Sequence, residues 1–166
     1  TLTSDMISLH IFDGNQFYIL LGNYTNCIDS ENGYGDEVKR LAYECLSKIV
    51  LTVSLDAPQD PDQEHPAKPI ISDMVKNATT KNTAIIVKQL IESLAKTQLK
   101  RKCMPWIKDT LGELYVEDEI EEEDKNENDD ENTHKEEEDE DDEDSDTQKA
   151  IRKIIRSAIS DAILKI

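Results

Sequence analysis

The chain has 166 residues, of which 37% are apolar and 5% aromatic, which bounds it to one modest domain. Its formal net charge of −18 is concentrated in residues 117–146, which hold 21 acidic residues and two lysines, whereas the remainder is nearly neutral. Three widely spaced cysteines are not typical of a secreted disulfide framework, and no apolar run could span a bilayer, so we expect a reducing compartment, nuclear or cytoplasmic, and no membrane segment.

Two short runs of β-branched, aromatic and aliphatic residues, 6–12 and 16–21, begin the chain. The Asp13-Gly14 pair between them is typical of a tight reversal, so the pattern predicts an N-terminal β-hairpin. Two strands alone are marginal in water, so we expect this hairpin to pack on the rest of the domain. A loop is expected over residues 22–35.

Apolar residues at spacings of three and four then predict a series of amphipathic helices. The first is expected from Asp36 to near Leu55, and it ends where prolines in residues 57–69 predict a linker. Two further helical patterns follow, and Pro105, a residue suited to a first helical turn, predicts the start of another helix. The two intermediate patterns cover residues 70–78 and 86–95, with a break at residues 79–82.

Residues 117–146 form an acidic tract that is almost entirely of one sign. Because the tract cannot bury enough apolar surface to offset the entropy of ordering, we predict that it is disordered. It resembles the acidic tails and loops of histone chaperones, ribosomal-protein escorts and nuclear-transport receptors, which implies a basic protein partner. The alternative is a solvating spacer. The candidate partner-binding residues are Glu136, Glu137, Glu138, Asp139, Glu140, Asp141, Asp142, Glu143 and Asp144.

Residues 147–166 carry the most regular amphipathic pattern in the chain, and we expect a helix capped near Thr147. This helix either packs back on the domain or docks on a partner, and Ile151, Ile155 and Ile159 are its candidate contacts. Its polar face is cationic, as in helices that lie on membranes, but the lack of Trp and Phe and the preceding polyanion argue against that use. The cations are Lys149, Arg152, Lys153 and Arg156.

A basic cluster surrounds Trp106, and such a cluster can contact phosphates and stack a base. The acidic tract begins nine residues after the last of these lysines and competes for the same cations, so we expect no direct nucleic-acid binding. The cluster consists of Lys96, Lys100, Arg101, Lys102 and Lys108.

No catalytic, cofactor or metal site is predicted. Gly33-Tyr34-Gly35 is followed by acidic residues and lacks the lysine that a phosphate-binding loop requires, so we interpret it as a turn. Cys45 lies within an apolar helical stripe, which is typical of a core residue. The three histidines and the cysteines have no metal-ligand spacing. We therefore predict a protein that is not an enzyme.

The predicted fold is mainly α, built from amphipathic helix pairs, with an N-terminal β-hairpin and a disordered acidic insert. Over roughly residues 36–166 the pattern resembles part of a HEAT-type or other α-solenoid scaffold, such as those of nuclear transport receptors. The hairpin favours a rival, compact α+β fold. We expect three regions: a hairpin plus helical domain (1–116), the tract (117–146) and a helix that packs on the domain or on a partner (147–166).

The function predicted from these features is that of a non-enzymatic protein-binding or escort segment, whose tract engages a basic partner such as a histone, a ribosomal protein, another nucleic-acid-binding protein or a transport cargo. The alternative is a structural scaffold subunit, or a fragment of a helical-repeat protein, in which the tract is only a spacer. Because the chain starts with Thr1 and ends in an apolar helix, we expect it to be part of a larger protein.

Overall fold

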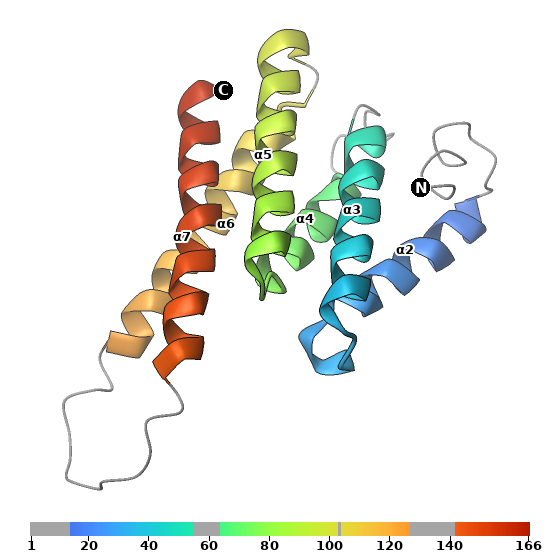
Figure 1. Cartoon of the computed structure of the whole chain (residues 1–166). Coiled ribbons are helices and arrows are strands. Elements are labelled where there is room, and N and C mark those ends of the chain that lie inside the picture. The colour runs from blue at the N-terminus through green and yellow to red at the C-terminus, as the bar shows by residue number, and fades with distance from the viewer. Residues whose placement is uncertain (1–13, 55–63, 103, 127–141) are drawn as a thin grey trace, which may run out of the picture.

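The computed structural model describes residues 14–54, 64–102, 104–126 and 142–166 (Figure 1). These residues are mainly helical, as predicted: 85% of them lie in helices and none lies in a strand. In chain order the elements are α2 (Gly14–Ile28), the short 3-10 helix η1 (Ser30–Asn32), α3 (Asp36–Val53), α4 (Ala67–Lys76), α5 (Lys81–Arg101), α6 (Trp106–Asn126) and α7 (Asp142–Lys165).

Helix α2 contains residues 16–21, so the second arm of the predicted hairpin is not a strand. The first arm, residues 6–12, lies outside the described residues. The five apolar residues at positions 17–21 fit the period of either a strand or a helix. The apolar pattern that continues beyond residue 21 favours a helix. Leu21, Tyr24 and Ile28 recur at spacings of three and four, and all three pack on the core.

The loop is shorter than the one predicted over residues 22–35, because α2 continues to Ile28. Only the turn that follows Ile28 remains. The side chain of Asp29 accepts a hydrogen bond from the backbone N–H of Glu31 at 3.0 Å and so caps η1. Gly33 ends η1 at a φ of 63°, a left-handed conformation that glycine adopts without steric cost. The glycines of this segment therefore shape a turn ahead of α3.

Helix α3 confirms the first predicted helix, beginning at Asp36 and ending at Val53. Its apolar stripe faces the core, and Leu46 at the centre of the stripe is fully buried. Tyr43 on the same face is also fully buried, and its hydroxyl donates a hydrogen bond to the carbonyl oxygen of Met74 at 2.9 Å. This bond joins α3 to α4 inside the core.

Helix α5 contains the pattern predicted over residues 86–95, and α4 contains all but the last two residues of the pattern predicted over residues 70–78. The linker predicted over residues 57–69 ends earlier than expected, because α4 begins at Ala67. Pro69 lies in the first turn of α4, where a proline is tolerated because the N–H that it lacks would have no partner within the helix. Helix α5 is fixed at its start by a capping box, in which Thr80 and Thr83 each accept a hydrogen bond from the other's backbone N–H.

Helices α6 and α7 extend into the acidic tract. Helix α6 continues through Asn126 and α7 begins at Asp142, so both ends of residues 117–146 are helical rather than disordered. Residues 127–141 lie outside the described residues. Glutamate is a good helix former, and the helix dipole favours acidic residues in a first turn. The start predicted near Thr147 is therefore five residues late.

The six long helices of the described residues form two layers (Figure 1). Helices α3, α5 and α7 lie side by side and run in the same direction, whereas α2, α4 and α6 cross behind them. Each consecutive pair, α2 with α3, α4 with α5 and α6 with α7, contributes one helix to each layer. A single core lies between the layers and includes Ile28, Leu46, Met74, Leu90 and Leu111.

Candidate functional site

The isoleucines of α7 that were predicted to bind a partner belong to the core of this chain. Ile151, Ile155 and Ile159 are 2%, 5% and 2% exposed, and they pack in one cluster with side chains of α5 and α6. Burying three such side chains contributes several kcal/mol, on the order of 2 kcal/mol for each. A partner could reach them only if α7 left the core.

The acidic residues predicted to bind a partner are divided by the start of α7. Asp142, Glu143 and Asp144 form its first turn. The other six, residues 136–141, lie outside the described residues. The tract is joined to the folded unit at both ends, because α6 and α7 pack on each other and both contribute side chains to the core.

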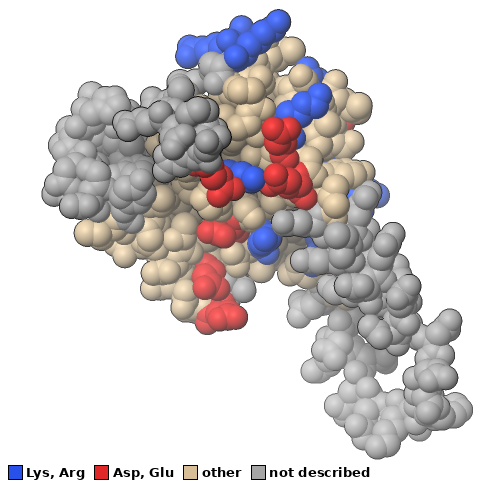
Figure 2. Space-filling view, turned by 180° about the vertical axis from the view of Figure 1, so that it is seen from behind, with Lys and Arg blue, Asp and Glu red and all other residues tan. Residues whose placement is uncertain are grey.

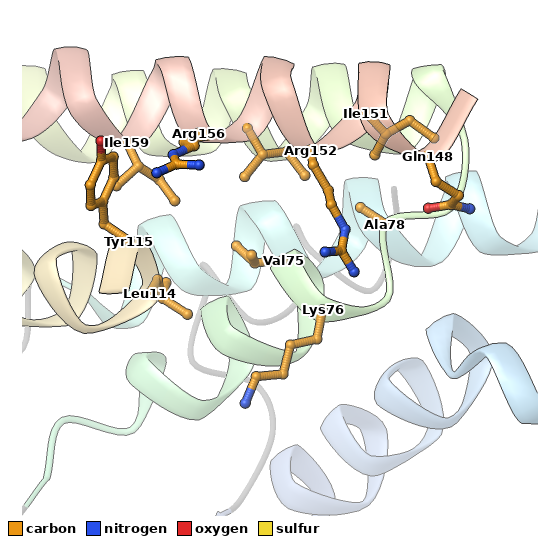
Figure 3. Close-up of a pocket in the computed structure, with 11 residues that line it drawn as sticks. Val75, Lys76, Ala78, Leu114, Tyr115, Gln148, Ile151, Arg152, Arg156 and Ile159 are labelled. Atoms are coloured by element: carbon orange, nitrogen blue, oxygen red, sulfur yellow. The ribbon is translucent and has the colours of Figure 1, made fainter. Parts of the chain in front are cut away.

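A cleft of about 120 Å³ lies between the end of α4, the middle of α6 and the middle of α7 (Figure 3). Three separate helices supply its walls, so only the folded chain forms it. Val75, Lys76, Ala78, Leu114, Tyr115, Gln148, Ile151, Arg152, Ile155, Arg156 and Ile159 line the cleft.

Three cations give this cleft its electrostatic character. Arg152 and Arg156 are four residues apart on α7, a spacing that puts both on one face of the helix, and Lys76 lies in the last turn of α4. The guanidinium carbon of Arg156 lies 5.0 Å from the centroid of the Tyr115 ring, a favourable cation–π distance that orients Arg156. Figure 3 shows Arg156 directed toward Tyr115, and Arg152 extending from α7 toward α4.

The remaining lining of the cleft is largely apolar. Leu114, Ile151 and Ile155 are almost fully buried beneath it, and Val75 and Tyr115 are partly exposed. None of the described side chains that line it is acidic. The cleft therefore places cationic side chains beside an apolar surface.

This cleft was not predicted from the sequence. The spacing of Arg152 and Arg156 was visible as part of the cationic face of the last helix. However, the contact of Tyr115 with Arg156, and the meeting of α4 with these helices, depend on how α4, α6 and α7 pack. No local pattern in the sequence encodes that packing.

In the basic cluster around Trp106, the indole is not open on both faces, as it would be in a site that stacks a base between free surfaces. The indole of Trp106 is stacked on the imidazole of His65, with ring centroids 4.0 Å apart and an angle of 9° between the planes. One face of the indole is therefore already covered. Lys100, Arg101 and Lys102 are exposed where α5 ends, and Figure 2 shows basic side chains gathered at this end of the molecule.

The titratable groups with shifted pKa values have structural partners. Burial raises the pKa of Tyr43, and the nearby charge of Asp73 adds to the effect. Hydrogen bonds to Glu113 and Glu64, at 2.7 and 3.1 Å, raise the pKa of Lys68 and tie α4 to α6. Burial raises the pKa of Asp73 as well. Each of these shifts is explained by packing or by an ion pair.

Within the described part of the chain, no group of His, Cys, Asp or Glu side chains is arranged to hold a metal ion. Cys27 is partly buried and Cys45 is buried. No helix among the described residues is long and apolar enough to cross a membrane.

Comparison with known proteins assigns no family: no protein-family profile matches the chain, and no curated protein or solved structure is significantly similar to it. The functional argument therefore rests on the residues of this chain alone. Its two distinctive features are the acidic tract, which includes the end of α6 and the start of α7, and the cleft beside these helices.

Proposed function

We propose that this chain is a non-enzymatic protein-binding segment, in which a helical scaffold presents an acidic tract to a basic protein. The partner is a histone, a ribosomal or other nucleic-acid-binding protein, or a basic transport cargo, in the nucleus or cytoplasm. The observation that supports this function best is the burial of Ile151, Ile155 and Ile159. Two elements were predicted to bind a partner, these isoleucines and the acidic tract. Because the isoleucines are buried in the core, the tract is the element that remains for binding.

The charge of the tract supplies the physical basis for binding. Residues 117–146 carry a net charge of −19, whereas the rest of the chain has 16 acidic and 17 basic residues. Such a concentration of one sign attracts basic surfaces over a distance of about one Debye length, roughly 8 Å at physiological salt, and accelerates their association. Binding of this kind releases counterions and weakens as the salt concentration rises.

A structural scaffold is the second candidate function. It is favoured by the two-layer arrangement, in which three consecutive helix pairs stack in chain order (Figure 1). Stacks of helix pairs of this kind are the construction of α-solenoid proteins, including the HEAT type, which bind partners along extended surfaces. In this function the tract is a spacer between α6 and α7.

Titration with core histones separates the two functions. The chain is compared with a variant in which the ten acidic residues between positions 127 and 141 are replaced by Ser and Gly, at about 50 mM and about 200 mM salt. We expect the native chain to bind, with affinity that falls steeply with salt, and the neutral variant to bind at least about tenfold more weakly at low salt.

A second variant, in which the order of residues 127–141 is scrambled, is the matched control for charge. It keeps the composition and length of the segment, so we expect it to bind histones as the native chain does. Equal binding by the native and neutral chains at both salt concentrations would contradict the escort function and favour the spacer.

A further inference from the structure

The end of the molecule at which α5 and α7 finish (Figure 1) carries six exposed cations that binding of a basic protein by the tract does not use. We call this surface the basic end. None of its six side chains forms an ion pair or a hydrogen bond with another residue that the structure describes. The cations are Lys96, Lys100 and Arg101 of α5, Lys102 directly after it, Lys108 of α6 and Lys165 of α7.

Helix dipoles explain only part of this gathering of charge. They favour basic residues in the last turns of α5 and α7, whereas Lys108 lies in the first turn of α6, where the dipole favours acidic residues. Among the described residues, three carboxylates lie within one turn of these cations along their helices, so positive charge prevails. They are Asp109, Asp161 and Glu92, of which Glu92 is paired with Lys88 at 3.9 Å.

Two leucines stand beside these cations. Leu164 and Leu99 are 83% and 58% exposed, the first and third most exposed large apolar side chains among the described residues. Leu99 lines a groove of about 390 Å³ between α5 and α7 together with Lys96 and Lys165, and Leu164 directly precedes Lys165. A single exposed leucine needs no explanation. Here, however, exposed leucines lie among unpaired cations, a combination that suits contact with a membrane surface.

We propose that the basic end binds the anionic surface of a membrane. Lysine and arginine side chains reach the lipid phosphates and carboxylates, and each cation near such a surface strengthens binding by roughly fivefold. The leucines enter the boundary between headgroups and acyl chains, and so gain apolar contact that a nucleic acid does not offer. Trp106, which would stack on a base, is already covered on one face by His65.

The fold separates the described ends of the acidic tract from the basic end. Along the sequence the tract begins nine residues after Lys108, which predicted competition for the same cations. At a rise of 1.5 Å per residue, Asn126 at the end of α6 lies about 27 Å along the helix from Lys108 (Figure 1). Asp142 at the start of α7 lies about 35 Å from Lys165 in the same way. Both separations exceed the Debye length of roughly 8 Å at physiological salt.

Flotation of the full chain with lipid vesicles tests the proposal. The chain should bind vesicles of phosphatidylcholine mixed with phosphatidylserine, should not bind vesicles of phosphatidylcholine alone, and should bind less as the salt concentration rises. A variant that lacks three cations of the basic end should bind the anionic vesicles at least about tenfold more weakly. This variant is Lys100→Gln, Arg101→Gln, Lys102→Gln.

The matched control removes the same charge from exposed positions in the first halves of α5 and α7, away from the basic end. It should change vesicle binding by no more than about twofold. The control is Lys81→Gln, Lys149→Gln, Lys153→Gln. Equal losses for the two triple variants, or equal binding to neutral and anionic vesicles, would overturn the proposal.

The leucines distinguish membrane contact from general attraction between charges. Leu99→Ser with Leu164→Ser keeps every cation and should weaken vesicle binding by about fivefold or more. Ile19→Ser with Val38→Ser changes two apolar side chains that are exposed elsewhere, so it should have little effect. No loss for the Leu99, Leu164 variant would contradict insertion of these leucines. A single-stranded oligonucleotide that binds the basic end, with no vesicle binding, would assign the surface to nucleic acid and overturn the proposal.

The result is independent of the function proposed for the tract. The variant in which the ten acidic residues of positions 127–141 are neutralised should bind vesicles within about twofold of the native chain, although it loses histone binding. Histone titration of the Lys100, Arg101, Lys102 variant should match that of the native chain. If this triple variant fails to fold, as judged by far-ultraviolet circular dichroism, the Leu99, Leu164 variant decides the question.

Discussion

The imidazole of His65 lies flat against the indole of Trp106, with ring centroids 4.0 Å apart, and this contact joins the start of α4 to the start of α6. Nδ1 of the same imidazole accepts a hydrogen bond from the backbone N–H of Ala67 at 3.1 Å. His65 therefore satisfies the backbone N–H of the first residue of α4 while its ring covers Trp106. The sequence placed His65 in a proline linker, whereas the structure shows that it contacts both α4 and α6.

His65→Ala should lower the free energy of unfolding by about 1 to 3 kcal/mol, because it removes both the ring contact and the acceptor for the Ala67 N–H. His65→Asn keeps a side-chain acceptor two residues before Ala67, so it should recover part of this loss. Trp106 is the only tryptophan in the chain, so its fluorescence can follow urea unfolding of all three proteins. Equal midpoints for the native protein and the His65→Ala variant would show that neither contact stabilises the fold.

Tyr43→Phe should cost about 1 to 2 kcal/mol near neutral pH, because it removes the buried hydrogen bond to the carbonyl oxygen of Met74. Burial raises the pKa of Tyr43 in the folded state. The stabilisation from its neutral hydroxyl is therefore complete below the ordinary tyrosine pKa of about 10 and decreases above it, by up to about 1.4 kcal/mol per pH unit.

The difference in stability between the native protein and the Tyr43→Phe variant should consequently shrink between about pH 8 and about pH 11. Denaturant unfolding at these two pH values measures it, and taking the difference removes effects that the two proteins share. A difference that stays constant with pH would mean that Tyr43 ionises equally in the folded and unfolded chains.

Ile155→Asp combined with Ile159→Asp should destabilise the whole domain by about 5 kcal/mol or more, because both carboxylates would be buried without partners. Ser157→Asp is the control, since this residue is exposed on the same helix and the change should cost less than about 0.5 kcal/mol. Circular dichroism during thermal unfolding gives both results. A double mutant with a native midpoint would show that α7 does not stabilise the domain.

Lys102→Gly should raise the free energy of unfolding by about 1 kcal/mol. Lys102 ends α5 at a φ of 53°, a left-handed conformation that costs a residue with a Cβ roughly 1 to 2 kcal/mol and costs glycine little. Lys100→Gly, within α5, removes the same charge and should destabilise by up to about 1 kcal/mol. If both substitutions destabilise equally, the backbone at Lys102 is not the cause.

The helices were predictable where apolar residues recur every three or four positions over a long stretch. The stripe around Leu46 is an example, because burial of one face of a helix is a local property of the sequence. Residues 16–21 were misassigned because a run of only five apolar residues fits the period of a strand or of a helix. The helical ends of the tract were not predicted. The high net charge indicated disorder, whereas the helix propensity of glutamate favours a helix there.

The candidate sites differ in how far the sequence could predict them. The acidic tract is a property of composition and needs no structure. By contrast, the cleft takes its lining from α4, α6 and α7, and it requires Tyr115 of α6 to meet Arg156 of α7, positions that are far apart in the chain. Only the packing of the three helices brings them together, so no spacing along the sequence could reveal this site.

Hydrogen exchange of α7, with and without bound core histones, tests the central claim most directly. The account holds that a basic partner binds the acidic tract while Ile151, Ile155 and Ile159 remain in the core. It predicts that backbone amides of α7 are protected in the free protein and stay equally protected when histones are bound. Loss of protection in α7 on binding would show that the isoleucines leave the core to meet the partner, and would contradict the account.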